Sequence, residues 1–135
     1  MIIKVTAGND VEVSVHEFPN GSISDINRKF TDLLGCDWYE RIRPRRVRDN
    51  WGIHNISMLV DEEGLLKPNK LNWLGTWLYG APIMGHILFV TEKMTKDGPE
   101  FCGLETEQAK ELIYEITDFL RNEKAIKFNL SDQMD

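Results

Sequence analysis

An arginine-rich run is the group of side chains in this sequence with the clearest chemical potential. Five arginines fall within residues 41–48, although the whole chain carries a net charge of −6. Alternate residues of an extended chain project to the same side, so Arg41, Arg43 and Arg45 are expected to present parallel guanidinium groups. Such groups bind phosphate or carboxylate through paired hydrogen bonds. The alternative is a solvated edge strand, whose charges prevent aggregation and pair with the acidic half of the chain.

Four tryptophans offer stacking or docking surfaces. Trp38 and Trp51 flank the arginine run, where an indole ring could stack a base beside a bound phosphate. Trp73 and Trp77 are four residues apart and would share one face of a helix. Large aromatic side chains serve either in a core or as anchors of an interface, and both roles stay open for this pair.

An acidic turn and three histidines give weaker indications of chemistry. Residues 61–63 (Asp-Glu-Glu) and Asn69 could hold a divalent ion or act in acid–base catalysis. Their spacing fits no calcium loop, however, and Glu-Glu-Gly is a common turn composition, as is asparagine after proline. The histidines lie in separate predicted strands without metal-ligand spacing: His16, His54 and His86.

No catalytic motif is present in the sequence. It contains no nucleophile elbow, no phosphate-binding loop and no dinucleotide fingerprint. Cys36 and Cys102 form no Cys-x-x-Cys pair and are expected to be reduced, partly buried thiols of a cytosolic protein. The sequence therefore predicts no metal and no cofactor, and favours a non-enzymatic protein over an enzyme.

Length and composition exclude several classes of protein. A chain of 135 residues with 41% hydrophobic and 28% charged residues is typical of one globular domain. No apolar run approaches the roughly 18 residues of a membrane helix, and the N-terminus lacks the basic region of a signal peptide. Residues 51–135 carry the whole net charge of −6. General nucleic-acid binding is therefore unfavourable, because it depends on counterion release by Lys and Arg.

Hydrophobic periodicity predicts an α+β domain. Strands are expected over residues 2–6, 11–16, 36–43, 55–60 and 86–93. Helices are expected from a Ser22 or Ser24 cap to Gly35, and from Thr106 through Leu120, with a short Trp-rich helix or loop after Pro68. The expected architecture is a mostly antiparallel sheet of about five strands with the two main helices packed on one face. It forms a single domain over 1–123, followed by a frayed tail over 124–135.

The stretch from Phe30 to Ile113 resembles a family of small proteins from phages, plasmids and integrative elements, known as domain of unknown function 3846. The similar segments are Leu34-Gly35-Cys36, Asp61–Leu66, Lys67-Pro68-Asn69, Gly85–Val90 and Leu104–Gln108. The chain departs from the family pattern in lacking a second glycine after Gly35 and in having Asp61 in place of asparagine. The resemblance implies a mobile-element origin and no established activity.

Together these features predict a non-enzymatic binding protein of a phage or mobile element, cytoplasmic in a bacterial host. It would antagonise a bacterial defence system by blocking a defence protein or by sequestering a nucleotide signal. Its acidic charge would suit a basic groove on a protein target. The predicted binding residues are Arg41, Arg43, Arg45, Trp38, Trp51, Trp73, Trp77 and Asn69.

Two other classes stay open at this point. One is a metal-dependent enzyme that processes nucleotides with Glu62 and Glu63. The other is a DNA-linked accessory factor of a mobile element, which would bind DNA through Arg45 and Arg46 with a steep salt dependence. A homo-oligomer is compatible with each of these readings.

Overall fold

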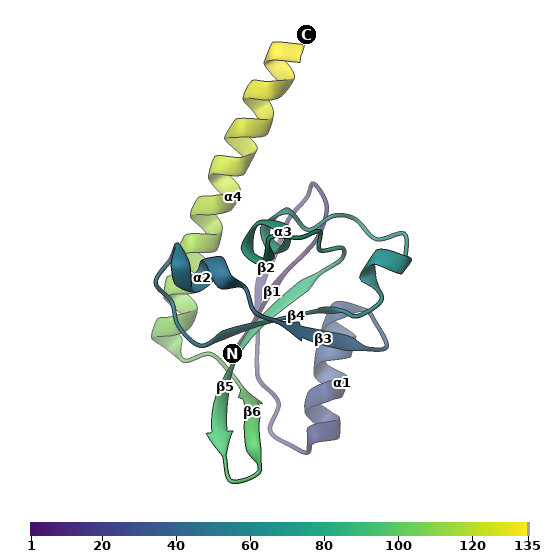
Figure 1. The fold of residues 1–135 in the computed structure, drawn as a ribbon, viewed down its shortest axis with the longest axis vertical. Helices are drawn as coiled ribbons and strands as arrows, with labels where there is room; N and C mark the ends of the chain where they lie inside the picture. Colours follow the sequence, from purple (N-terminus) through teal and green to yellow (C-terminus); the bar gives the residue numbers. More distant parts are fainter. Residues whose placement is uncertain (135) are drawn as a thin grey trace.

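A computed structural model describes the backbone of residues 1–134 and the side chains of residues 1–122. It confirms the predicted α+β class with an antiparallel sheet (Figure 1). The strands are β1 (Ile2–Val5), β2 (Val13–His16), β3 (Tyr39–Ile42), β4 (Ile56–Asp61), β5 (Ile87–Thr95) and β6 (Gly98–Cys102). The helices are α1 (Ile23–Leu34), α2 (Arg45–Asp49), α3 (Trp73–Tyr79) and α4 (Thr106–Met134), with a 3-10 turn, η1 (Gly64–Leu66).

The longest strand, β5, organises the sheet. The strand order is β2-β1-β5-β4-β3, and β6 pairs with the second half of β5. Every pairing is antiparallel. All residues from Ile87 to Thr91 are buried. This continuous burial requires both faces of the sheet to be covered, since neighbouring side chains of a strand point to opposite faces.

The helices lie on both faces of the sheet, so the prediction of two main helices on one face is wrong (Figure 1). Phe30 and Leu34 of α1 pack against one face, in a cluster with Ile2. The other face packs against α2, α3 and α4, in a cluster that includes Ile3 and Leu112. The physical reason is that central strands carry apolar residues at consecutive positions, as at Ile2 and Ile3, so one layer of helices cannot remove both faces from water.

Helix α1 begins and ends where its cap residues predict. The hydroxyl of Ser22 accepts a hydrogen bond from the Asp25 N–H, and the Asp25 carboxylate accepts one from the Ser22 N–H. This reciprocal capping gives acceptors to two backbone N–H groups that have none within the helix. Gly35 ends the helix in the left-handed conformation, at φ 67°.

Helix α4 packs its first half against the sheet and then projects from the rest of the molecule (Figure 1). Ala109, Leu112 and Ile116 are buried, as their helical spacing predicts. The ribbon continues through Met134. The predicted frayed tail over 124–135 lies outside the residues whose side chains are described and stays a prediction.

Three elements were not expected from the sequence: α2, η1 and β6. The expected strand over 36–43 is shorter, and its arginine-rich end turns into α2 instead of continuing extended. The Trp-rich segment forms a helix, α3, capped by Asn72 and ended by Gly80. Among the described residues, no helix combines the length and the apolar character that crossing a membrane requires.

Candidate functional site

The arginine run is divided between a strand and a helix. Arg41 lies in β3, Arg43 follows the strand, and Arg45 begins α2. Pro44 separates the two elements, because its ring restricts φ and it has no N–H to continue the ladder. The expectation that Arg41, Arg43 and Arg45 lie along one extended chain is therefore wrong for Arg45.

The turn at Pro44 nevertheless brings four of the five arginines to one cavity of about 290 Å³, here called the arginine pocket. It lies where the connection from β3 through α2 returns to β4, beside β5. Four guanidinium-bearing residues and a single carboxylate residue line it, so it is strongly positive within an acidic chain. Its lining consists of Arg41, Arg43, Arg45, Arg48, Pro44, Val47, Ile53, Asn55, Ile56, Ser57 and Glu92.

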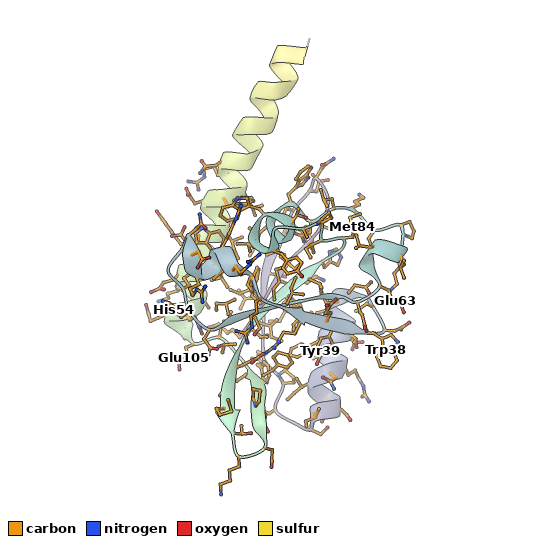
Figure 2. The ribbon with its side chains drawn as sticks, in the orientation of Figure 1. Trp38, Tyr39, His54, Glu63, Met84 and Glu105 are labelled. Carbon is orange, nitrogen blue, oxygen red and sulfur yellow. The ribbon has the colours of Figure 1, made fainter. Side chains whose placement is uncertain are left out.

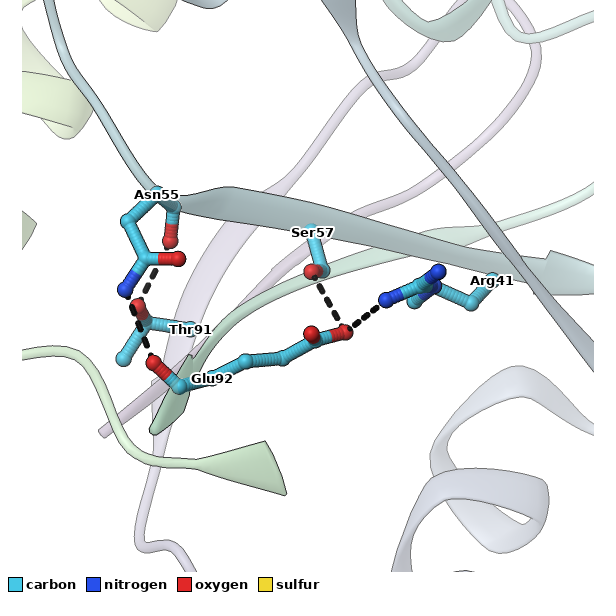
Figure 3. Close-up of polar contacts among 5 residues, drawn as sticks. All are labelled: Arg41, Asn55, Ser57, Thr91 and Glu92. Carbon is cyan, nitrogen blue, oxygen red and sulfur yellow. Dashed lines mark hydrogen bonds and ion pairs between the residues drawn. The ribbon is translucent and has the colours of Figure 1, made fainter. Parts of the chain in front are cut away.

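Glu92 connects three neighbouring strands beside this pocket (Figure 3). Arg41 on β3 donates from Nη1 to Oε1 of Glu92 on β5, at 2.5 Å. Ser57 on β4 donates its hydroxyl to the same oxygen, at 3.2 Å. The side chain of Glu92 is only 16% exposed. These contacts are what a half-buried carboxylate needs, because each replaces hydrogen bonds lost from water.

Asn55 holds the loop before β4 against β5. Its Nδ2 donates to the backbone carbonyl of Glu92 at 2.8 Å, and Thr91 Oγ1 donates to the Asn55 carbonyl at 2.6 Å (Figure 3). Asn55 is in the left-handed region at φ 63°, which asparagine tolerates better than most residues. The pocket wall at Asn55 and Glu92 is thus fixed by main-chain contacts in addition to the ion pair.

The arginines of the run differ in how they are paired. Arg41 is paired with Glu92, and Arg48 with the exposed Asp49. Arg46 is outside the pocket, with its Cζ 4.9 Å from the centroid of the Trp77 ring. Within the described part of the chain, Arg43 and Arg45 make no ion pair. Two guanidinium groups at the pocket are therefore available to an anionic ligand.

The predicted tryptophans do not join the arginine pocket. The rings of Trp51 and Trp77 pack against each other at a tilt, with centroids 5.8 Å apart. The Trp77 ring also packs against Phe119 on α4, with centroids 4.9 Å apart. Both indoles are partly buried and pack against the hydrophobic core. Neither Trp38 nor Trp51 lines the pocket, so the structure does not place an indole where it could stack a base beside a phosphate there.

The other two tryptophans are more exposed. Trp38 precedes β3 and is 65% exposed, on the opposite side of the molecule from His54 (Figure 2). Trp73 begins α3 and is 44% exposed. Of the two tryptophans four residues apart, Trp73 therefore faces solvent and Trp77 faces the core.

Asn69 lies in a separate cavity of about 390 Å³ that shares no lining residue with the arginine pocket. Its Nδ2 donates to the Gly64 carbonyl at 3.4 Å, which is a contact within the turn. His86 also lines this cavity, and its Nδ1 accepts a hydrogen bond from the Ala7 N–H. Burial and the nearby Lys4 lower the pKa of His86, which keeps the ring neutral near pH 7.

The acidic turn is satisfied by local contacts. Asp61 pairs with Lys67 at 2.9 Å and accepts the Glu63 N–H at 2.9 Å. No cluster of three or more potential metal ligands occurs in the part of the chain that the structure describes. Burial raises the pKa of both Cys36 and Cys102, so neither favours the thiolate form.

Three polar residues of the pocket were missed in the sequence: Asn55, Ser57 and Glu92. Glu92 had a recognisable signal, because it is the first charged residue after the apolar run of β5. Asn55 and Ser57 had none, since their importance arises from pairing β4 with β5.

Comparisons of the chain with known proteins found no match. No protein family model matches the chain, no curated protein matches it, and no solved structure matches it.

Proposed function

We propose that this protein binds a phosphate-bearing small molecule in the arginine pocket and holds it without transforming it. One observation carries the proposal: four arginines and a single carboxylate line one cavity, and two of those arginines are unpaired within the described residues. Guanidinium groups match the geometry of phosphate oxygens and stay charged at any physiological pH.

The size of the pocket supports a small ligand. Its volume of about 290 Å³ is just below the usual range for small-molecule sites, which begins at roughly 300 Å³. The chain around it is acidic, which disfavours a long nucleic acid on the surrounding surface. Local positive charge within a negative protein thus favours a compact anion over a polymer.

The groups at the pocket favour binding over catalysis. Arginine cannot exchange protons at neutral pH, so Arg43 and Arg45 cannot act as acid or base. Glu92 is held by Arg41, and the Ser57 hydroxyl donates to Glu92 and not to a base. A nucleophile with an adjacent free base is therefore lacking among the residues that line this cavity.

The biological setting that we propose is sequestration of a nucleotide-type signal of a bacterial defence system. The resemblance to mobile-element proteins motivates the setting, and the arginine pocket supports the ligand class. A second candidate is blockade of a defence protein, which the exposed hydrophobic side chains favour. These include Trp38, Leu65 and Leu66.

Calorimetric titration tests the proposed function directly. Pyrophosphate and nucleoside diphosphates are titrated into the protein and into the Arg43→Gln/Arg45→Gln variant. Each lost charge-assisted hydrogen bond costs about 1.5–3 kcal/mol, so the variant is expected to bind at least about tenfold more weakly. Arg28→Gln/Arg121→Gln, on α1 and α4 outside the pocket, is the matched control, because it also removes two positive charges.

Equal affinity of the variant and the native protein would contradict the proposal. Mass analysis of the recovered ligand separates binding from turnover, since a sequestering protein returns the ligand unchanged. Conversion of the nucleotide would instead support the enzyme alternative.

A further inference from the structure

We infer that Arg41 makes the arginine pocket select ligands with two adjacent phosphoryl groups, and that Glu92 is an internal competitor that weakens their binding. The inference rests on the proposed function and adds the ligand class and the residue that determines it. It starts from the position of the Glu92 carboxylate, which is bound to Arg41 and Ser57 at the wall of the pocket.

The carboxylate of Glu92 occupies the kind of position that a ligand oxygen would take. Carboxylate and phosphate oxygens are alternative partners for the same guanidinium donors. Glu92 is covalently attached and its backbone is held by Asn55, so it competes with a free ligand at a high effective concentration. In the free protein, Glu92 thus occupies Nη1 of Arg41 and offsets its charge.

Arg43 and Arg45 are not masked in this way. They make no ion pair among the described residues and line the same cavity. A single phosphate is therefore expected to bind there, without Arg41. A second phosphoryl group, linked to the first, reaches the Nη1 group of Arg41 only by displacing Glu92. A pyrophosphate group can do this because its second phosphoryl is tethered, as Glu92 itself is.

The pocket has no aromatic surface that would identify a base. No Phe, Tyr or Trp lines it, and the nearby Trp51 stacks near Trp77 instead. Base recognition commonly uses stacking on aromatic rings or hydrogen bonds to base edges. The ligand class is therefore a diphosphate-containing compound, recognised by its phosphoryl groups with little dependence on its base.

Titrations of inorganic phosphate and pyrophosphate into the native protein and three variants test the inference. The native protein is expected to bind pyrophosphate at least about tenfold more tightly than phosphate, which corresponds to about 1.4 kcal/mol. Glu92→Gln preserves shape and removes the competing charge. It is expected to strengthen pyrophosphate binding about tenfold and phosphate binding less than about threefold.

The double variant Arg41→Gln/Glu92→Gln removes both members of the pair. Its affinity for pyrophosphate is expected to fall to that for phosphate, while phosphate binding stays unchanged. Glu100→Gln on β6, outside the pocket, removes the same charge and controls for the general field of the protein. Thermal unfolding of each variant verifies that it is folded.

Two results would overturn the inference while the proposed function survives. One is an equal change in phosphate and pyrophosphate affinity on Glu92→Gln, or a weakening of both. The other is a preference of more than about tenfold among the diphosphates of adenosine, guanosine, cytidine and uridine, because stacking or edge contacts must then identify the base. If the native protein binds neither anion, the proposed function fails with it.

Discussion

Arg41 and Glu92 form an ion pair that bridges β3 and β5 across the intervening strand β4, with 2.5 Å between Nη1 and Oε1. Both residues project to the same face of the sheet as Ser57, which lies between them on β4 (Figure 3). The pair places one positive and one negative group at the wall of the arginine pocket. It therefore affects the charge that a ligand meets at this edge of the sheet.

We expect the ion pair to contribute little to folding. The side chain of Arg41 is 38% exposed, and partly exposed ion pairs typically contribute less than about 1 kcal/mol, because water and salt screen them. Arg41→Gln/Glu92→Gln should therefore lower the free energy of unfolding by less than about 1 kcal/mol in urea denaturation. A loss well above about 1 kcal/mol would contradict this expectation, because the pair would then contribute more than a screened, partly exposed pair does.

Asn55 is expected to contribute to the stability of the fold in two separate ways, through its backbone conformation and through its side chain. Asn55→Ala loses the hydrogen bond to the Glu92 carbonyl and places Ala at φ 63°, at a total cost of about 2–3 kcal/mol. Asn55→Gly loses only the hydrogen bond, at about 1 kcal/mol, since glycine accepts this conformation. Urea denaturation of both variants measures the difference. Equal losses would show that the left-handed backbone carries no cost at this position.

Trp77 is expected to contribute far more to stability than Trp38. Trp77 stacks near Trp51 and Phe119, and truncation of a large core aromatic costs about 3 kcal/mol or more. Trp77→Ala should approach this loss, while Trp38→Ala, at an exposed position, should change stability by less than about 0.5 kcal/mol. Thermal and urea unfolding measure both. If Trp38→Ala is the more destabilising change, the assignment of Trp77 to the core is contradicted.

The half-buried histidine His86 predicts a loss of stability in mild acid. Burial and Lys4 lower its pKa below the ordinary 6.5, so the unfolded chain takes up a proton first as the pH falls. The free energy of unfolding should therefore decrease below about pH 6.5, until the pH reaches the pKa of the folded state. His16, whose pKa is lowered chiefly by burial, contributes in the same direction.

Unfolding measured between pH 7 and pH 5 checks this pH dependence. His86→Gln retains an acceptor for the Ala7 N–H and removes the titrating group, so its stability should vary less with pH. His16→Gln/His86→Gln should vary less again. An unchanged slope in the double variant would assign the acid sensitivity to other groups.

Local elements of the fold could be predicted because their causes lie within a few residues. Ser22 and Gly35 delimit α1 through hydrogen bonds and a left-handed cap that involve only neighbouring positions. The spacing of Leu112 and Ile116 predicts the buried face of α4 in the same way. Strand β6 escaped prediction because Pro99 and Gly98 weaken its local pattern, and its pairing with β5 stabilises it.

The α+β class, the helix boundaries at capping residues and the concentration of positive charge in residues 41–48 can all be inferred from the amino-acid sequence. The coverage of both sheet faces by helices and the contact of Glu92 with Arg41 arise only when the chain folds. The physical reason is that strand pairing joins residues far apart in the chain. Glu92 and Arg41 are separated by 51 positions, and no local propensity encodes that distance.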